Sequence, residues 1–256
     1  MPWVFRLAMT LPGGVSPFSH SIQSARSLVG SGGGRSMAGR LSAGSAGSPP
    51  AVEVRDPGGV TRRLVLASAS PARLGVLRAA GFAPEVMVSG VDEHDVTGPA
   101  HQVARVLAER KARAVADGLG NADALVVGCD SVLDVDGTTR GKPASVGEAR
   151  SWWASVAGRT AVLHSGHCVI DTATGESASA VASTVVRYGH PTDAEIDAYL
   201  ATSEPLQVAG GFTIDGYAAP FIDGIDGDHG TVLGLSLPVL RRLLAELGTP
   251  IVELWA

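Results

Sequence analysis

The sequence predicts an α/β fold in which a mixed sheet is flanked by helices. From residue 62 onward, short apolar runs typical of strands alternate with segments whose apolar residues recur at helical spacing. These segments do not repeat a strict strand–helix–strand unit, and we find no internal repeat. The pattern therefore indicates one elongated domain of mixed α and β structure.

Each element is bounded by an ordinary start or stop signal. Capping boxes at Ser145/Glu148 and Thr192/Glu195 open two helices, and Asp136-Gly137 is typical of a tight hairpin. The expected strands are 64–67, 86–88, 124–128, 132–135, 162–170 and 179–187. The expected helices are 74–80, 100–116, 145–157, 192–200 and 237–247.

Residues 1–60 differ from the rest in composition. They contain five Arg against Glu53 and Asp56, a net charge of +3, so the remainder carries −8 of the total −5. Ser, Gly and Arg dominate, and such a segment buries too little apolar surface to fold. We expect a disordered leader at 1–60 and one folded domain at 61–256. The leader is either an organelle transit peptide or an over-long start, with Met37 as one internal alternative.

The segment Ser68-Ala69-Ser70-Pro71-Ala72-Arg73 joins an expected strand to an expected helix. Ser70 is a good N-cap and Pro71 fits the first helical position. Free N–H groups, two hydroxyls and a guanidinium then lie together at a helix start, where phosphate binds readily. This segment predicts an anion site, with Arg73 suited to bidentate contact.

Asp130 and Lys111 are candidates for chemistry. Asp130 ends a buried-looking strand, a frequent place for a general base or metal ligand, although Asp also caps ordinary turns. Lys111 lies on the apolar stripe of its helix, where a cation must find an anion or extend to solvent. Lys142 lies in the constrained Gly-Lys-Pro loop. Glu93 belongs to an Asp-Glu pair that either binds a divalent ion or is simply solvated.

The histidines and cysteines carry weaker signals. His164 and His167 are three apart on an expected strand, so they point to opposite faces and we interpret them as structural. Cys129 and Cys168 fit neither a metal pair nor a disulfide framework, which favours a reducing, cytoplasmic setting. The negative charge argues against nucleic acid as a partner, and no apolar run of 18 residues predicts a membrane span.

Six motifs together resemble the Maf family of nucleoside triphosphate pyrophosphatases. They are SASPAR (68–73), GVDE (90–93), LAERKA (107–112), GCDS (128–131), GKP (141–143) and AGGFTIDG (209–216). The resemblance covers roughly residues 62–248. It implies an elongated α/β fold with a central cleft, shared with inosine triphosphate pyrophosphatases. It also implies hydrolysis of a nucleoside triphosphate to the monophosphate and pyrophosphate with a divalent metal, Mg²⁺ or Mn²⁺.

The resemblance also assigns roles. Asp130 would be the catalytic carboxylate, and Glu93 with Asp130 would hold the metal. The triphosphate would be bound by Ser68, Ser70, Arg73, Lys111 and Lys142. The family includes dimers, so a homodimer is among the expected assemblies.

Three positions depart from the dTTP/UTP-specific members, which carry Arg, Thr and Gln there. This chain has Ala72, Ser131 and Asp215. These base-specificity candidates leave the preferred nucleobase open. Two other functions are carried as alternatives: a non-enzymatic regulator of septum formation and cell division, and a phosphatase that removes only the terminal phosphate.

Overall fold

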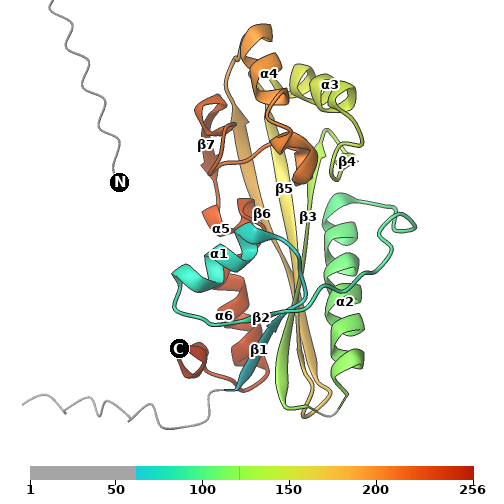
Figure 1. Ribbon diagram of the computed structural model, residues 1–256, viewed down its shortest axis with the longest axis vertical. Coiled ribbons are helices and arrows are strands. Elements are labelled where there is room, and N and C mark those ends of the chain that lie inside the picture. The colour runs from blue at the N-terminus through green and yellow to red at the C-terminus, as the bar shows by residue number, and fades with distance from the viewer. Residues whose placement is uncertain (1–61, 121) are drawn as a thin grey trace, which may run out of the picture. The chain divides into compact units, whose positions relative to one another are not determined.

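The computed structural model describes residues 62–120 and 122–256 (Figure 1). These residues belong to a compact unit that spans Asp56–Ala256. The leader expected at 1–60 lies outside the described residues.

The described residues form a seven-stranded mixed sheet in the order β2-β1-β3-β5-β6-β7, with β4 paired to β3. The strands are β1 (Arg63–Leu66), β2 (Glu85–Val86), β3 (Ala124–Val135), β4 (Thr138–Arg140), β5 (Thr160–Asp171), β6 (Ser177–Tyr188) and β7 (Ile222–Asp226). The β1–β2 and β1–β3 pairs are parallel, and all the other pairs are antiparallel. The expected α/β fold with a mixed sheet is confirmed.

Helices cover both faces of this sheet, as Figure 1 shows. They are α1 (Pro71–Ala79), α2 (Ala100–Leu119), α3 (Val146–Val156), α4 (Asp193–Leu200), α5 (His229–Val232) and α6 (Leu237–Glu246). Short 3-10 helices lie at Glu204–Gln207, Ala209–Gly211, Ala219–Phe221 and Ile251–Leu254. The apolar stripe of α2 packs on one face of β3 and β5, and α6 packs on the opposite face.

Two glycines bring α2 close to the sheet. A Cβ at Gly128 would overlap the carbonyl oxygen of Ala108, and one at Gly166 would overlap that of Ala104. The backbone of α2 therefore lies almost directly on β3 and β5, as a missing side chain permits. This contact determines how deep the side chains of α2 reach into the domain.

Local signals specify the element ends as expected, with three differences. Ser70 caps α1, and the Thr192/Glu195 capping box is complete. At α3, Ser145 caps the helix but Glu148 accepts the N–H of Ala144, so that expected box is only half formed. Residues 124–135 form one continuous strand where two were expected. The expected strand at 86–88 is displaced to Glu85–Val86 and shortened.

One edge of β3 is paired only at its two ends. All of β1, up to its last residue Leu66, pairs with Ala124–Val127. β4 pairs with Leu133–Val135. Between these segments, no described strand pairs with residues 128–132 on that edge. β1 ends beside Val127, at one end of this interval, and β4 ends beside Leu133, at the other end. The loops after β1 and β4 therefore lead toward the same part of β3, where Asp130 lies.

Candidate active site

Two polar clusters lie on opposite faces of β3 at its unpaired edge. They are centred on consecutive residues, Asp130 and Ser131, whose side chains point to opposite faces because a strand alternates. Asp130 faces α2, and Ser131 contacts Arg73 of α1. We call them the Lys111 cluster and the Arg73 cluster after their cations.

The Lys111 cluster joins three residues expected to share a site. Lys111 Nζ lies 2.6 Å from Asp130 Oδ1 and 2.6 Å from Glu93 Oε1. Lys111 and Asp130 are 9% and 6% exposed, whereas Glu93 reaches in from an exposed loop. One ammonium therefore bridges a buried carboxylate and a solvent-facing one, and the three charges sum to −1.

Burial raises the pKa of the Asp130 carboxyl, because removing a charge from water disfavours the ionised form. The positive charges of Lys111 and Arg73 oppose this rise, and the Glu93 carboxylate adds to it. A carboxylate whose pKa is subject to such opposing effects is suited to proton transfer or cation binding.

The Arg73 cluster holds a guanidinium that has no salt bridge to any described carboxylate. Arg73 Nε donates to the Gly234 carbonyl at 3.0 Å, and Nη1 donates to Ser68 Oγ and to the Cys129 carbonyl, both at 2.9 Å. Nη2 donates to Ser131 Oγ at 3.1 Å. Arg73 is 9% exposed, and the groups to which its N–H groups donate are all neutral dipoles. An anion is the partner that such a cation lacks.

These contacts change the expected role of Arg73. They use four of its five N–H groups and leave one for a ligand. The expected bidentate phosphate contact therefore does not fit this arrangement, in which Arg73 holds α1, β3 and the turn at Gly234 together.

The two serines of the expected phosphate loop are already engaged as acceptors. Ser70 Oγ accepts the N–H of Arg73 at 3.4 Å, and Ser68 Oγ accepts the N–H of Ser70 at 3.2 Å in addition to Arg73. Each hydroxyl keeps its own hydrogen for donation. Ala72 lies beside them on α1 and is half-buried.

Lys142 and Asp215 are exposed and form no salt bridge with any described residue. The loop that carries Lys142 is nevertheless held in place. Gly210 N donates to the Gly141 carbonyl at 2.8 Å, and Trp153 Nε1 donates to the Gly211 carbonyl at 2.9 Å. The structure shows no contact from Lys142 or Asp215 to either cluster.

The donor set fits a hard divalent ion. Asp130 and Glu93 each supply carboxylate oxygens beside Lys111, the ligands that Mg²⁺ and Mn²⁺ prefer. No group of three or more His, Cys, Asp or Glu side chains with metal-binding geometry occurs in the described part of the chain. An ion held by two carboxylates would leave positions for phosphate oxygens and water, as is usual for Mg²⁺.

Sequence reasoning missed the residues that support the Arg73 cluster. Ser131 Oγ lies 2.7 Å from Ser165 Oγ, and Ser165 donates to the Thr231 carbonyl at 2.8 Å. A Cβ at Gly234 would lie 2.8 Å from Arg73 Nε. Ser165, Thr231 and Gly234 are far from Arg73 in sequence and lie outside the six motifs. The one signal that could have indicated them is the two-residue spacing of Ser165 and His167, which places both on one face of a strand.

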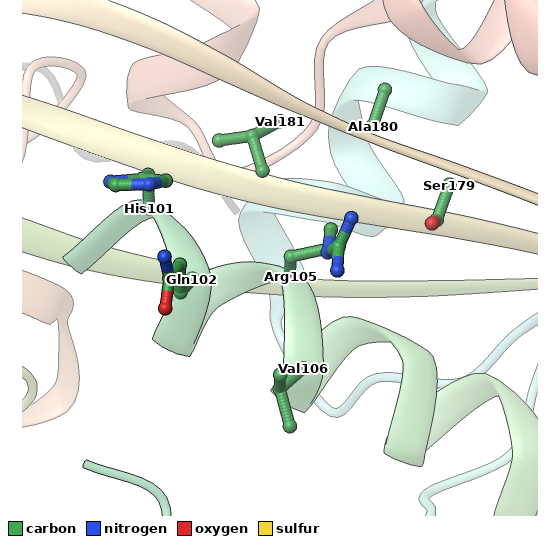
Figure 2. Close-up of a pocket in the computed structure, with 7 residues that line it drawn as sticks. All are labelled: His101, Gln102, Arg105, Val106, Ser179, Ala180 and Val181. Carbon is green, nitrogen blue, oxygen red and sulfur yellow. The ribbon is translucent and has the colours of Figure 1, made fainter. Parts of the chain in front are cut away.

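A hollow of about 520 Å³ lies between α2 and β6 and is lined by no residue of either cluster. Figure 2 shows the side chains that line it. Its lining residues are His101, Gln102, Arg105, Val106, Ser179, Ala180 and Val181. Arg105 already pairs with Glu109, and Glu109 accepts the Ser179 hydroxyl. The hollow contains none of the expected site residues, so the expected central cleft stays a prediction.

The fold and the two clusters define an α/β domain with two features at the unpaired edge of β3. One is a buried carboxylate–lysine pair, and the other is a buried arginine that has no carboxylate partner among the described residues. The family described as Maf-like protein matches residues 63–247. The chain belongs to this family.

Curated relatives agree with this assignment. The chain is 65% identical over 196 residues to a nucleoside triphosphate pyrophosphatase of Streptomyces coelicolor, covering 76% of this chain and 95% of the relative. A protein of the same name from Salinispora tropica is 54% identical over 203 residues, covering 78% and 90%. A solved dITP/XTP pyrophosphatase of Mycobacterium abscessus matches 72% of this chain and 94% of its own, at 18% identity and a TM-score of 0.35. The family assignment rests on the sequence matches.

Among the described residues, no helix combines the length and apolar character that crossing a membrane requires.

Proposed function

We propose that this domain hydrolyses a nucleoside triphosphate to the monophosphate and pyrophosphate. The observation that carries the proposal is the pairing of two opposite electrostatic environments on adjacent residues of β3. A buried guanidinium without a carboxylate partner lies on one face, and a Lys–Asp–Glu cluster of net charge −1 lies on the other. The names of the curated relatives support the same reaction class.

The reaction is attack of water on the α-phosphorus. A bond forms between the water oxygen and phosphorus, and the bond to the α–β bridging oxygen breaks, so that pyrophosphate leaves with its electron pair. The ionised Asp130 carboxylate either accepts the proton of the attacking water or holds the metal, and both roles need its negative charge. Lys111 would orient Asp130, with which it pairs at 2.6 Å, and its ammonium would offset negative charge that develops on the phosphates.

Glu93 and Asp130 would hold a divalent cation, Mg²⁺ or Mn²⁺, which would offset the negative charge that develops on the phosphates. Arg73 contributes one N–H and a fixed positive charge, and Ser68 and Ser70 contribute hydroxyl donors. Lys142, on the loop after β4, would bind the phosphates.

The substrate is expected to be a non-standard or modified nucleotide. Ala72, Ser131 and Asp215 differ from the residues of dTTP/UTP-specific relatives, so that preference is not carried over. Ser131 is bound by Arg73 and Ser165, which makes it part of the rigid wall of the site. Asp215 is exposed and free to face a base.

The alternatives make different predictions about products. A phosphatase of the terminal phosphate would release orthophosphate, and a regulator of septum formation and cell division would release neither product. The retained Lys111 cluster favours an enzyme, because three charged residues converge there.

The test is product analysis with UTP, dTTP, 7-methyl-GTP and 5-methyl-UTP, each with Mg²⁺ or Mn²⁺. We expect pyrophosphate from at least one of them, and Asp130→Asn should lower that rate roughly a thousandfold, as loss of a general base or metal ligand does. Asp134→Asn is the matched control, because this half-buried Asp of β3 caps the hairpin through Gly137 N instead. Orthophosphate alone, or an undiminished rate in Asp130→Asn, would contradict the proposal.

A further inference from the structure

Three hydrogen bonds from buried side chains hold the loop Asp228–Ser236, which contains α5, next to Arg73. Arg73 Nε donates to the Gly234 carbonyl at 3.0 Å, and Ser165 Oγ donates to the Thr231 carbonyl at 2.8 Å. In the third, His167 Nε2 accepts the backbone N–H of Ser236 at 2.8 Å. We call this segment the 228–236 loop.

The three hydrogen bonds form one buried unit with the Arg73 cluster. Ser165 and His167 lie on the same face of β5, two residues apart, and both are 0% exposed. Their partners across the strands are Ser131 and Cys129, which supply acceptors to Arg73. His167 thus holds the loop only two residues beyond the carbonyl that orients the guanidinium.

The hydrogen-bond pattern assigns the protonation of His167. Because Nε2 accepts, the proton of the neutral ring is on the buried Nδ1. Burial, together with the Arg73 charge, lowers the pKa of His167 to about 4. The ring is therefore neutral near pH 7 and available as an acceptor.

We propose that His167 is a positioning residue for the phosphate site: by accepting the Ser236 N–H, it fixes the 228–236 loop, whose Gly234 carbonyl orients Arg73. This role rests on the proposed function, since Arg73 is taken to face the triphosphate. His167 itself touches no substrate. It acts through Ser236, Gly234 and Arg73 in turn.

Variants of matched size separate this role from simple packing. In His167→Gln the amide oxygen reaches about the place of Nε2 and restores the acceptor, whereas in His167→Asn it stops about where Nδ1 lies. We expect His167→Asn to lower kcat/KM roughly tenfold, as one buried unsatisfied N–H does, and His167→Gln to stay within about threefold. His164→Asn is the control, because His164 binds Ser183 on the other face of the same strand.

A double-mutant cycle tests whether the effect passes through Arg73. If it does, His167→Asn in an Arg73→Lys background lowers kcat/KM much less than in the wild type, because the orientation it disturbs is already lost. If His167→Asn lowers kcat/KM by the same factor in the Arg73→Lys background as in the wild type, the proposal is overturned. So would a kcat/KM of His167→Asn within about twofold of wild type.

Solvent exchange of the Arg73 Nε–H, followed by ¹⁵N NMR and assigned by its loss in Arg73→Lys, gives a readout without turnover. It should be slow in the wild type and in His167→Gln, and roughly tenfold faster in His167→Asn. An equal rate in all three overturns the inference even if the enzyme is active. If the wild type releases no pyrophosphate, the proposed function fails, while the exchange rates still decide whether His167 holds Arg73.

Discussion

A lysine on the apolar stripe of a helix either extends to solvent or pairs with a buried anion, and Lys111 does the second. Its neighbours on the stripe, Leu107 and Val115, are buried in the core as the helical spacing predicts. Because Gly128 has no side chain, α2 packs closely on β3. The Lys111 side chain therefore contacts Asp130 and does not extend to solvent. The sequence put this lysine on the apolar stripe and left both outcomes open, and the register between helix and strand determines its partner.

His167 makes stability depend on pH in a direction that can be worked out. Its pKa is about 4 in the folded protein against 6.5 for an ordinary histidine, because burial and the Arg73 charge lower it. A backbone hydrogen bond at Ser165 and the Asp228 charge raise it, and Arg242 of α6 lowers it. Between pH 6.5 and 4 the unfolded chain gains a proton that the folded chain does not. The free energy of unfolding therefore falls as pH falls through this window, by about 3 kcal/mol at most.

His167→Gln has no proton to gain, so it should lose this part of the pH dependence. Urea unfolding at pH 7 and pH 4.5 measures it. We expect the drop in unfolding free energy between the two values to be about 2–3 kcal/mol smaller in His167→Gln than in wild type. An equal drop in both proteins would mean that His167 titrates normally in the fold.

At the scale of elements, the packing of α2 on β3 is the contact on which the Lys111 cluster depends. Gly128→Ala would push the Cβ into the backbone of α2 at Ala108 and Ala112, so the helix must move outward. We expect a loss of about 2–3 kcal/mol in unfolding free energy and a clear loss of activity, because Lys111 and Asp130 separate.

Gly118 provides the control on the same helix. A Cβ at Gly118 meets nothing within 4 Å, so Gly118→Ala should raise stability by up to about 1 kcal/mol through helix propensity alone. Denaturant melts and kcat/KM of both variants are the measurements. A Gly128→Ala protein with unchanged stability and activity would show that α2 is free to shift.

Elements with strong local signals were predictable, and those formed by tertiary pairing were not. The helix caps at Ser70 and Thr192 and the Asp136-Gly137 turn need only neighbouring residues. β7 was missed because Ile-Asp-Gly-Ile-Asp reads as a turn, and its strand conformation comes from pairing with Val185–Tyr188 of β6. The acceptors that fix Arg73 beyond Ser68 also come from tertiary contacts, two from β3 and one from the loop before α6.

At the scale of the whole described domain, the site results from a change of pairing along one strand. β3 takes a parallel partner at its start and a hairpin partner at its end, which leaves residues 128–132 unpaired on one edge. Asp130 and Ser131 lie in this interval, so their two clusters occupy both faces of the sheet. Individual motifs marked these residues as candidates, but only the topology shows why they meet.

The catalytic unit is expected to be complete without the basic leader. The compact unit begins at Asp56, the family match spans 63–247, and both clusters lie between Ser68 and Gly234. A chain shortened to begin at Asp56 should therefore keep its melting temperature within about 2 °C and its kcat/KM within about twofold. Differential scanning calorimetry and pyrophosphate release measure the two quantities. A large loss of activity with an unchanged melting temperature would instead assign residues 1–55 a part in substrate binding. These residues carry five Arg against Glu53, a net charge of +4, which is of the sign that attracts a triphosphate.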